Sequence, residues 1–303
     1  EEDKFQKIVC AYLAEYAVKY FGEEQLESNS FTYRLKTILD NVMYLMKHIM
    51  EELSQSEFFV ADCELKIGED IPSYTIVLPD GHKIAVCGSV DRVDIMQRAD
   101  ITYLRIIDYK TGTKQFKLSD ILYGINLQML LYLHSIEASG GDKYGEIVPA
   151  GILYMPATVP YISSDSLKSI DKLPDELNKK LKMNGLLLKD TEIIHGMDKT
   201  DVATYIPVKI KAGEPVSSTS LATLAEFGKI FKKVDMLIAE MGKNIYNGNI
   251  EAKPLKGGHD SCEYCPYDSV CAYRQSNPIT CFSVDNKTVI EEITNEINGK
   301  EEE

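Results

Sequence analysis

Two short segments constrain this chain most: residues 88–94, with the sequence GSVDRVD, and residues 106–110, with the sequence IIDYK. Apolar residues surround each polar one, which indicates two neighbouring strands that are largely buried. Side chains two positions apart in a strand point to the same face, so Asp108 and Lys110 share a face and Tyr109 points away. An unpaired charge on a buried strand is costly, so these charges need partners or a function.

With Asp91 on the adjacent strand, these residues are the set that metal-dependent phosphodiester cleavage needs. Carboxylates bind a hard divalent cation such as Mg2+ or Mn2+. A lysine can orient or deprotonate the attacking water, or neutralise developing charge. A lone Asp-x-Lys is more often a structural ion pair, which also perturbs pKa values. The two strands together favour the catalytic interpretation.

A helix is predicted over residues 119–137, with Ser119 as its N-cap. Gln128 and Tyr132 are four positions apart and share one face of it. Their neighbours are apolar, so the helix is expected to be buried nearly all round. The two polar side chains must then find partners or line a polar site. The alternative is that Tyr132 is a core aromatic whose hydroxyl is hydrogen-bonded.

In this order, the motifs G-x-V-D-R-V-D, I-D-Y-K and Q-x-x-x-Y resemble the RecB-type nuclease branch of the PD-(D/E)xK superfamily. Residues 185–190, 206–208 and 262–267 are similar to the C-terminal region of the AddB (RexB) subunit of bacterial AddAB helicase–nucleases. The resemblance covers roughly residues 58–273. It implies that the catalytic residues are Asp91, Asp108 and Lys110, and that the supporting motif contains Gln128 and Tyr132.

The resemblance also implies a His or Glu ligand on an earlier helix, which we expect to lie upstream of Glu1. His48 lies in a different segment, and the family role does not carry over to it. Glu64, on a predicted strand, could approach the site, although we expect it to face solvent. Asp94 is expected to pair with Arg92 or to hold its strand in place.

Cys262, Cys265 and Cys271 have the spacing C-x2-C-x5-C. Thiols at this density near a chain end predict a metal site in an intracellular protein. Zinc would need four nitrogen or sulfur ligands, and His259 could supply the fourth. An iron–sulfur cluster needs four thiolates. The family resemblance implies a 4Fe–4S cluster whose fourth cysteine lies upstream, outside this chain.

The chain has seven cysteines, and the other four are less informative. Cys10 and Cys281 could replace the missing thiolate, although Cys10 is expected to be a small core residue. Cys63 and Cys87 lie in apolar strands and are also expected in the core. The odd number and the lack of a secretory signal disfavour disulfides and indicate a cytoplasmic protein. No run approaches the ~18 apolar residues of a membrane span, so we expect no membrane partner.

The formal net charge of −14 is the main objection to DNA binding, because phosphate contacts need Lys and Arg. Part of the acid lies in residues 1–3 and 291–303, and the C-terminal stretch is expected to be solvated and poorly ordered. The lysines between residues 179 and 233 are expected to be solvated surface rather than a DNA track. We infer that this chain does not bind DNA strongly alone and that a larger machine delivers the strand.

The fold expected from the family is an α/β PD-(D/E)xK, or restriction-endonuclease-like, core with a mixed central sheet flanked by helices. Helical insertions and a C-terminal cysteine staple would elaborate it. Predicted helices cover residues 4–21, 31–53, 167–183 and 219–246, and predicted strands cover 58–67, 74–78, 83–87 and 149–155. The expected regions are a helical part (1–57), a nuclease core (58–160), a helical insertion with a long helix (161–250), an iron–sulfur staple (251–282) and an acidic tail (283–303).

These patterns predict a Mg2+- or Mn2+-dependent deoxyribonuclease. Asp91 and Asp108 would bind the metal, with the backbone carbonyl of Tyr109 as a further ligand. The resemblance implies an exonuclease module that processes double-strand-break ends for recombinational repair, on the strand ending 5′ at the break, with an ATP-driven AddA-like protein as partner. Two alternatives remain: a catalytically idle DNA-binding or scaffold module, and a stand-alone Cas4-like exonuclease.

Overall fold

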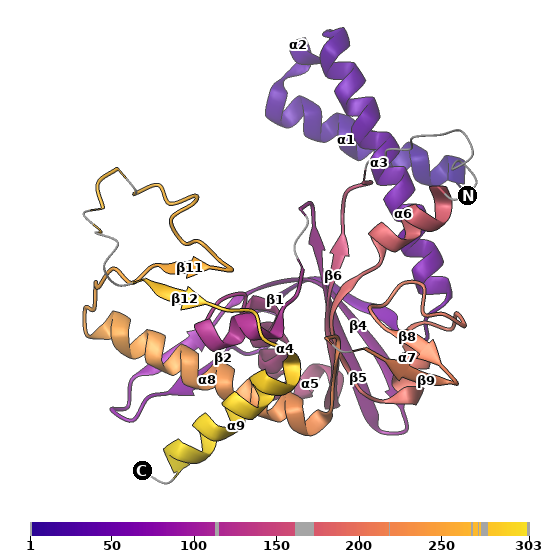
Figure 1. Cartoon of the computed structure of the whole chain (residues 1–303). Helices are drawn as coiled ribbons and strands as arrows, with labels where there is room; N and C mark the ends of the chain where they lie inside the picture. Colours follow the sequence, from indigo (N-terminus) through magenta and orange to yellow (C-terminus); the bar gives the residue numbers. More distant parts are fainter. Residues whose placement is uncertain are drawn as a thin grey trace.

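A six-stranded mixed sheet forms the centre of the molecule, with the strand order β1-β4-β5-β6-β7-β10 (Figure 1). The computed structural model describes residues 2–112, 115–160, 173–217, 219–267, 269–271, 273 and 278–301. The bounds of the strands are Phe59–Ile67 for β1, Gly88–Arg98 for β4, Ile101–Lys110 for β5, Glu146–Pro156 for β6, Asn184–Leu188 for β7 and Leu221–Ala222 for β10.

The direction of the strands decides which of their ends meet. β1, β4 and β5 are antiparallel neighbours, β5 and β6 are parallel, and β7 runs against β6. The C-terminal ends of β5 and β6 therefore lie at the same end of the sheet as the N-terminal end of β7. The parallel pair needs a crossover, and the connection contains two short helices and α4 (Gln128–Ser139).

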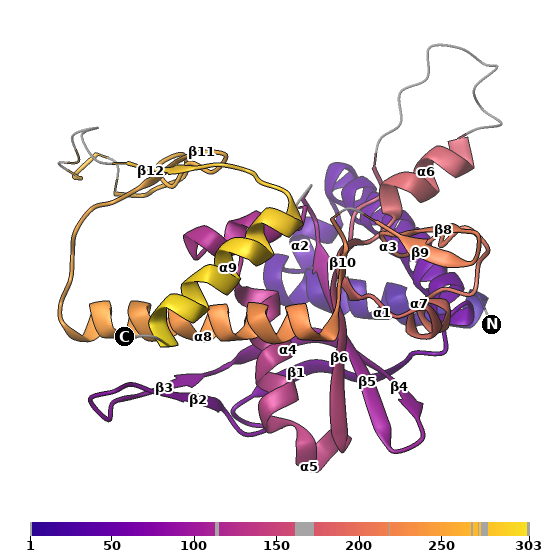
Figure 2. The ribbon, with the colours of Figure 1, turned by 60° about the horizontal axis from the view of Figure 1, so that its bottom comes forward.

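Helices cover both faces of this sheet, as the predicted fold class requires. On one face α4 packs against β1, β5 and β6, α8 (Leu224–Tyr246) packs against α4, and α9 (Asn286–Glu301) packs against α8 (Figure 2). On the other face, Glu52 near the end of α3 (Asn29–Ser54) reaches Arg92 and Arg105 in the sheet.

The remaining elements lie around this core. The helices are α1 (Glu2–Phe21), α2 (Glu23–Leu26), η1 (Leu118–Tyr123), α5 (Gly141–Tyr144), α6 (Leu173–Leu181) and α7 (Thr191–Met197). The short strand pairs are β2 (Tyr74–Val77) with β3 (Lys83–Val86), β8 (Lys209–Lys211) with β9 (Glu214–Val216), and β11 (Leu255–Gly257) with β12 (Ile279–Cys281). Among the described residues, no helix has both the length and the apolar composition that crossing a membrane requires.

The prediction of one helix over residues 119–137 is wrong. The segment begins as a 3-10 helix, η1, in which Ser119 is buried and does not act as an N-cap. Gly124 and Asn126 then take left-handed conformations, with φ of 68° and 56°. An α-helix cannot contain such residues without a large steric cost, so α4 begins only at Gln128.

The C-terminal stretch also differs from the prediction of a poorly ordered tail. Residues Asn286–Glu301 form α9, in which Val289, Ile293 and Ile297 are spaced four apart and buried. Glu296 adds an ion pair with Lys233 of α8, at 2.5 Å. The acidic composition therefore belongs to the solvent-facing side of an amphipathic helix.

Two other predicted helices have described bounds that differ from the expected ones. The helix expected over residues 219–246 begins at Leu224, because Thr223 and Glu226 form a capping box there. For the helix expected over residues 167–183, α6 accounts for Leu173–Leu181, and residues 167–172 lie outside the described part of the chain.

Candidate active site

Three carboxylates lie in a row across β1, β4 and β5: Glu64, Asp91 and Asp108. Residues directly opposite each other in antiparallel strands point to the same face. Cys63 pairs with Arg92 and Leu65 pairs with Val90, so Glu64 lies opposite Asp91. Arg92 pairs with Ile107, so Asp91 lies opposite Asp108. The backbone N–H of Tyr109 donates to Asp91 Oδ2 at 2.9 Å, which ties the β4 carboxylate to β5.

Asp108 and Lys110 share one face at the end of β5, as the alternation of the strand predicts. Lys110 Nζ lies 2.5 Å from Asp108 Oδ2 and 5.6 Å from the centre of the Tyr154 ring. Asp108 is only 7% exposed, and its buried Oδ2 receives no hydrogen bond of good geometry from the described residues despite this short contact. Carboxylate oxygens are also the ligands that hard divalent cations prefer.

Tyr154 pairs with Asp108 across β5 and β6 and is buried. Burial, followed by the negative charges of Asp108 and Asp120, raises the pKa of Tyr154 to about 12. The phenol therefore stays neutral over the physiological range. It forms an uncharged wall beside the Lys110 ammonium.

The backbone of Glu64 is unusual, because its φ is 55° although it is not a glycine. A left-handed residue of this kind costs about 1–2 kcal/mol, and such strain is often found at functional sites. The Glu64 side chain is exposed, as expected, and accepts a hydrogen bond of 3.1 Å from the Ser89 hydroxyl. The sequence gives no sign that Glu64 also lies opposite Asp91, since strand register is not a local property.

Tyr132 of α4 connects the helix motif to the strand that carries Asp91. A Cβ atom placed on Gly88 would lie 2.2 Å from the Tyr132 hydroxyl oxygen, so only glycine allows this close approach. Gln128, one turn earlier, is exposed at the first position of α4. The structure thus brings Tyr132 against β4 and leaves Gln128 at the helix start.

Asp94 is part of a buried charge network on the opposite face of the sheet. Its carboxylate accepts hydrogen bonds from Arg92 at 2.6 and 2.7 Å and from Arg105 at 2.9 and 3.0 Å. Glu52 accepts from both arginines, at 3.0 and 2.6 Å. Burial would raise the pKa of Asp94, but the charges of Arg105 and Arg92 outweigh it and lower that pKa. Asp94 therefore both pairs with Arg92 and fastens its strand to α3, and is not a metal ligand candidate.

The three clustered cysteines lie in a turn-rich segment between β11 and β12. The N–H of Cys265 donates to the carbonyl of Cys262 at 3.3 Å, and the N–H of Cys271 donates to the carbonyl of Tyr267 at 2.8 Å. Within the described ranges, no three His, Cys, Asp or Glu side chains converge to hold a metal ion as they stand. This holds for the cysteine segment and for the carboxylate row.

The other cysteines differ in their surroundings. Cys281 is buried on β12, where burial raises the pKa of its thiol, and it lines a small cavity together with His259. Cys10 is half-buried on α1. The prediction that Cys63 and Cys87 are core residues is wrong, because both are exposed: β1 is an edge strand, and Cys87 follows a separate two-stranded hairpin.

Comparison with known proteins places this geometry in a family context. Residues 3–272 match the family model of the PD-(D/E)XK nuclease superfamily. The chain is 38% identical over 246 residues, 79% of its length, to a Thermoanaerobacter sp. (strain X514) protein that is named as one component of an ATP-dependent helicase/deoxyribonuclease. Proteins of the same name from Alkaliphilus oremlandii and Clostridium kluyveri are both 36% identical, over 87% and 90% of the chain. The chain spans only 21% to 24% of the length of these three relatives.

Proposed function

The chain belongs to the PD-(D/E)XK nuclease superfamily, and on that premise we propose that it is the divalent-metal-dependent exonuclease module of a helicase–nuclease acting on DNA ends. The observation that carries the proposal is the meeting of Asp91, Asp108 and Lys110 at one end of β4 and β5. The helicase–nuclease context comes from the name shared by its relatives, of which the chain covers about a quarter or less.

The carboxylate row fits a hard divalent cation. Asp91 and Asp108 would hold Mg2+ or Mn2+, the backbone carbonyl of Tyr109 would be a further ligand, and Glu64 is the third carboxylate of the row. Oxygen ligands of this type are the ones these cations prefer. When bound, the metal would polarise the scissile phosphate and lower the pKa of a coordinated water.

The protein side chains supply the remaining functions. Lys110 lies beside Asp108, where it would orient the attacking water and neutralise negative charge on the phosphate. The Tyr154 ring packs beside the ammonium and limits its movement. Tyr132 fixes the start of β4 through Gly88 and so positions Asp91 indirectly.

The cysteine segment is proposed to bind a 4Fe–4S cluster through Cys262, Cys265 and Cys271, with a fourth thiolate from outside this chain. Tyr264, Tyr267 and Val270 of this segment are all exposed, so the segment has few buried apolar contacts of its own. A bound metal group would link its parts together. Metal binding would contribute folding free energy to a segment with so little core. Zinc with His259 is the alternative that the donor types also allow.

The proposed partners are DNA ends and an ATP-driven, AddA-like protein in the cytoplasm, in double-strand-break repair. This sequence contains no phosphate-binding Gly-x-x-x-x-Gly-Lys-Ser/Thr loop, so ATP hydrolysis would have to come from elsewhere. Co-purification of an ATPase would support this arrangement over a stand-alone Cas4-like exonuclease.

Cleavage of end-labelled single-stranded DNA in Mg2+ tests the proposed activity. The assay uses the longest natural polypeptide that carries this chain, together with its ATPase partner. We expect the wild type to cleave and Asp108→Ala to lose at least ~100-fold, because a ligand of the metal is removed. Asp100→Ala, an exposed residue in the turn between β4 and β5, is the matched control and should cleave normally.

Two outcomes would contradict this proposal. Equal activity of wild type and Asp108→Ala would place the activity elsewhere. No cleavage by either protein, with cluster and partner present, would favour an idle DNA-binding scaffold. Calorimetric titration with Mn2+ gives a second readout, since an idle module should show no binding that Asp108→Ala removes.

A further inference from the structure

Four lysines line one groove near the start of β7, the strand next to the edge strand β10. Lys179 comes from α6, Lys182 from the connection to β7, and Lys209 and Lys211 from β8. The groove, which we call the lysine groove, has a volume of about 600 Å³, and none of the described residues that line it is acidic or aromatic. This concentration of positive charge is unexpected in a chain with a net charge of −14.

Three of the four lysines in the lysine groove form no ion pair with the described residues. Lys179, Lys209 and Lys211 are exposed, and within the described part of the chain no ion pair involves them. Glu214 pairs with Lys211 across β8 and β9, but its carboxylate accepts a hydrogen bond of 2.7 Å from the Thr191 hydroxyl. The positive charges therefore face solvent and are available to an anionic ligand.

Lys182 has a different part in the lysine groove. Its ammonium donates to the carbonyls of Ala203 and Val208, at 2.6 and 3.0 Å, and so fixes the floor of the groove. Burial lowers the pKa of Lys182, the charge of Asp198 acts in the opposite direction, and the smaller effect of Lys209 lowers it further. Lys182 therefore holds the floor of the groove in place, and the exposed charges come from Lys179, Lys209 and Lys211.

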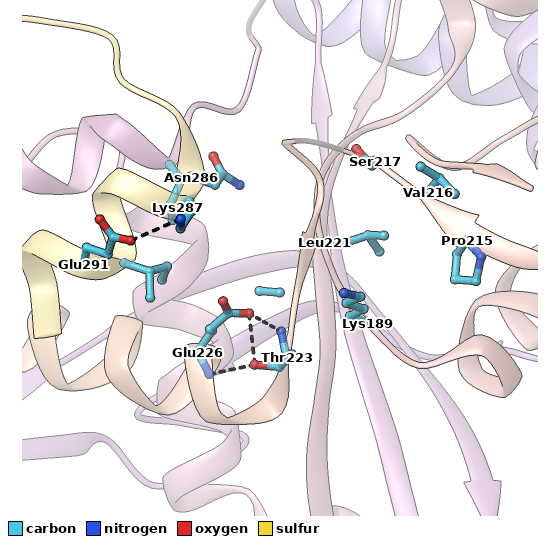
Figure 3. Close-up of a pocket in the computed structure, with 13 residues that line it drawn as sticks. Lys189, Pro215, Val216, Ser217, Leu221, Thr223, Glu226, Asn286, Lys287 and Glu291 are labelled. Atoms are coloured by element: carbon cyan, nitrogen blue, oxygen red, sulfur yellow. Dashed lines mark hydrogen bonds and ion pairs between the residues drawn. The ribbon is translucent and has the colours of Figure 1, made fainter.

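A neighbouring pocket is lined by charges of both signs (Figure 3). It has a volume of about 500 Å³ and shares Val216 and Ser217 with the lysine groove. Inside it, Glu226 caps the start of α8 through Thr223, and Lys287 lies 3.6 Å from Glu291. Its lining holds two lysines and two glutamates, whereas the described lining of the lysine groove holds lysines and no carboxylate.

The lysine groove lies at the same end of the sheet as the carboxylates. Asp108 on β5 pairs with Tyr154 on β6, and Tyr154 pairs with Asn184 at the start of β7. Lys182 precedes Asn184 by two residues. Two strand spacings of ~4.8 Å separate the Asp108 and Asn184 backbones, so the groove begins within roughly 10 Å to 15 Å of Asp108.

We propose that the lysine groove binds the phosphodiester backbone of single-stranded DNA and guides the strand to Asp108 and Lys110. This inference rests on the proposed nuclease function and adds the path by which the substrate arrives. The lining lysines are point charges without aromatic neighbours in the groove, so binding should be independent of sequence and strongly salt-dependent. The local concentration of lysines also explains how an acidic chain can contact DNA along this groove.

Fluorescence anisotropy with a labelled oligothymidylate tests the lysine groove. The 303-residue chain carries Asp108→Ala, and EDTA is present, so binding is measured without cleavage. Lys209→Gln together with Lys211→Gln should weaken binding about tenfold at low salt. The slope of log K against log salt should become less steep by about 1.4, since each phosphate contact to a single strand contributes ~0.7. Circular dichroism checks that the variant is folded.

The control is the pair Lys83→Gln and Lys243→Gln, which removes the same charge from the opposite side of the molecule, where β3 and α8 lie far from β8 (Figure 2). It should leave both the affinity for DNA and the salt slope nearly unchanged.

Equal losses in the two double variants would overturn the proposal, and so would no DNA binding by the starting protein. Tighter binding of an RNA oligonucleotide than of DNA would assign the groove to another ligand. None of these outcomes depends on cleavage, so the groove and the proposed activity can fail separately.

Discussion

Glu64 holds a backbone conformation that a glycine would adopt more easily, directly opposite Asp91. We expect Glu64→Gly to be more stable than Glu64→Ala by about 1 kcal/mol, because both lose the Ser89 contact but only alanine keeps the left-handed strain. Urea unfolding of the two variants measures this difference. Both variants should bind Mn2+ more weakly than the wild type in calorimetry. A more stable alanine variant would show that the backbone at position 64 is not strained.

Single residues of the site could be predicted from the sequence only where the reason is local. The alternation of a strand was sufficient to put Asp108 and Lys110 on one face, and the structure confirms it. The place of Glu64 depends on the register of β1 against β4, which spans 27 positions of sequence between Glu64 and Asp91 and has no local signal. The contact between Tyr132 and Gly88 is non-local in the same way.

At the scale of elements, His134 fastens α4 to α8 and to the β2 hairpin. Its ring nitrogens lie 3.2 Å from Glu137, from Asp235 and from the Tyr74 hydroxyl, and the ring stacks on Phe231. Burial would lower the pKa of His134, but the hydrogen bonds and charges of Asp235 and Glu137 outweigh it and raise that pKa from 6.5 to about 9. Protonated His134 is therefore a stabilising link between these elements.

A pH series of urea unfolding tests this link. Because the pKa is raised in the folded protein, the stabilisation should be fully present below pH 6.5 and be lost as the pH rises through about 9. Relative to His134→Gln, the wild type should gain on the order of 1–3 kcal/mol at pH 6 and little at pH 10. Asp235→Asn should shift this loss to lower pH. A difference between wild type and His134→Gln that does not change with pH would contradict the assignment.

Elements with strong periodic patterns were predictable, and those set by special backbone positions or by docking were not. The helices α1 and α3 and the strand β1 match their predicted ranges to within two residues. The break after η1 depends on left-handed Gly124 and Asn126, which the apolar pattern does not reveal. The C-terminal helix α9 depends on docking of Val289, Ile293 and Ile297 against distant parts of the chain, and its acidic composition gave the wrong expectation.

The whole molecule separates its two kinds of charge. Carboxylates line up across one end of the sheet, while the lysine groove lies two strands away at the same end. On the face of the sheet opposite the carboxylates, Glu52, Arg92, Asp94 and Arg105 form a buried network of charge that holds α3 on the sheet. Removing one member of such a network typically costs about 3–5 kcal/mol, so this scaffold can tolerate strain at the site above it.

Repulsion among the aligned carboxylates of Glu64, Asp91 and Asp108 should lower the free energy of unfolding, and a bound cation would remove this repulsion. In EDTA, Asp91→Asn should be more stable than the wild type by ~0.5–1 kcal/mol, because it relieves repulsion from Glu64 and Asp108 while its amide oxygen can still accept from the Tyr109 N–H. With Mg2+ at about 100 times its Kd, the wild type should gain ~2.7 kcal/mol and the variant almost nothing, so the order of their Tm values reverses. Asp100→Asn, at the other end of the same strands, should follow the wild type in both conditions. The same order of Tm values with and without Mg2+ would mean that the carboxylate row is not a cation site. A reversal would show that the metal-free fold loses stability by keeping these charges together.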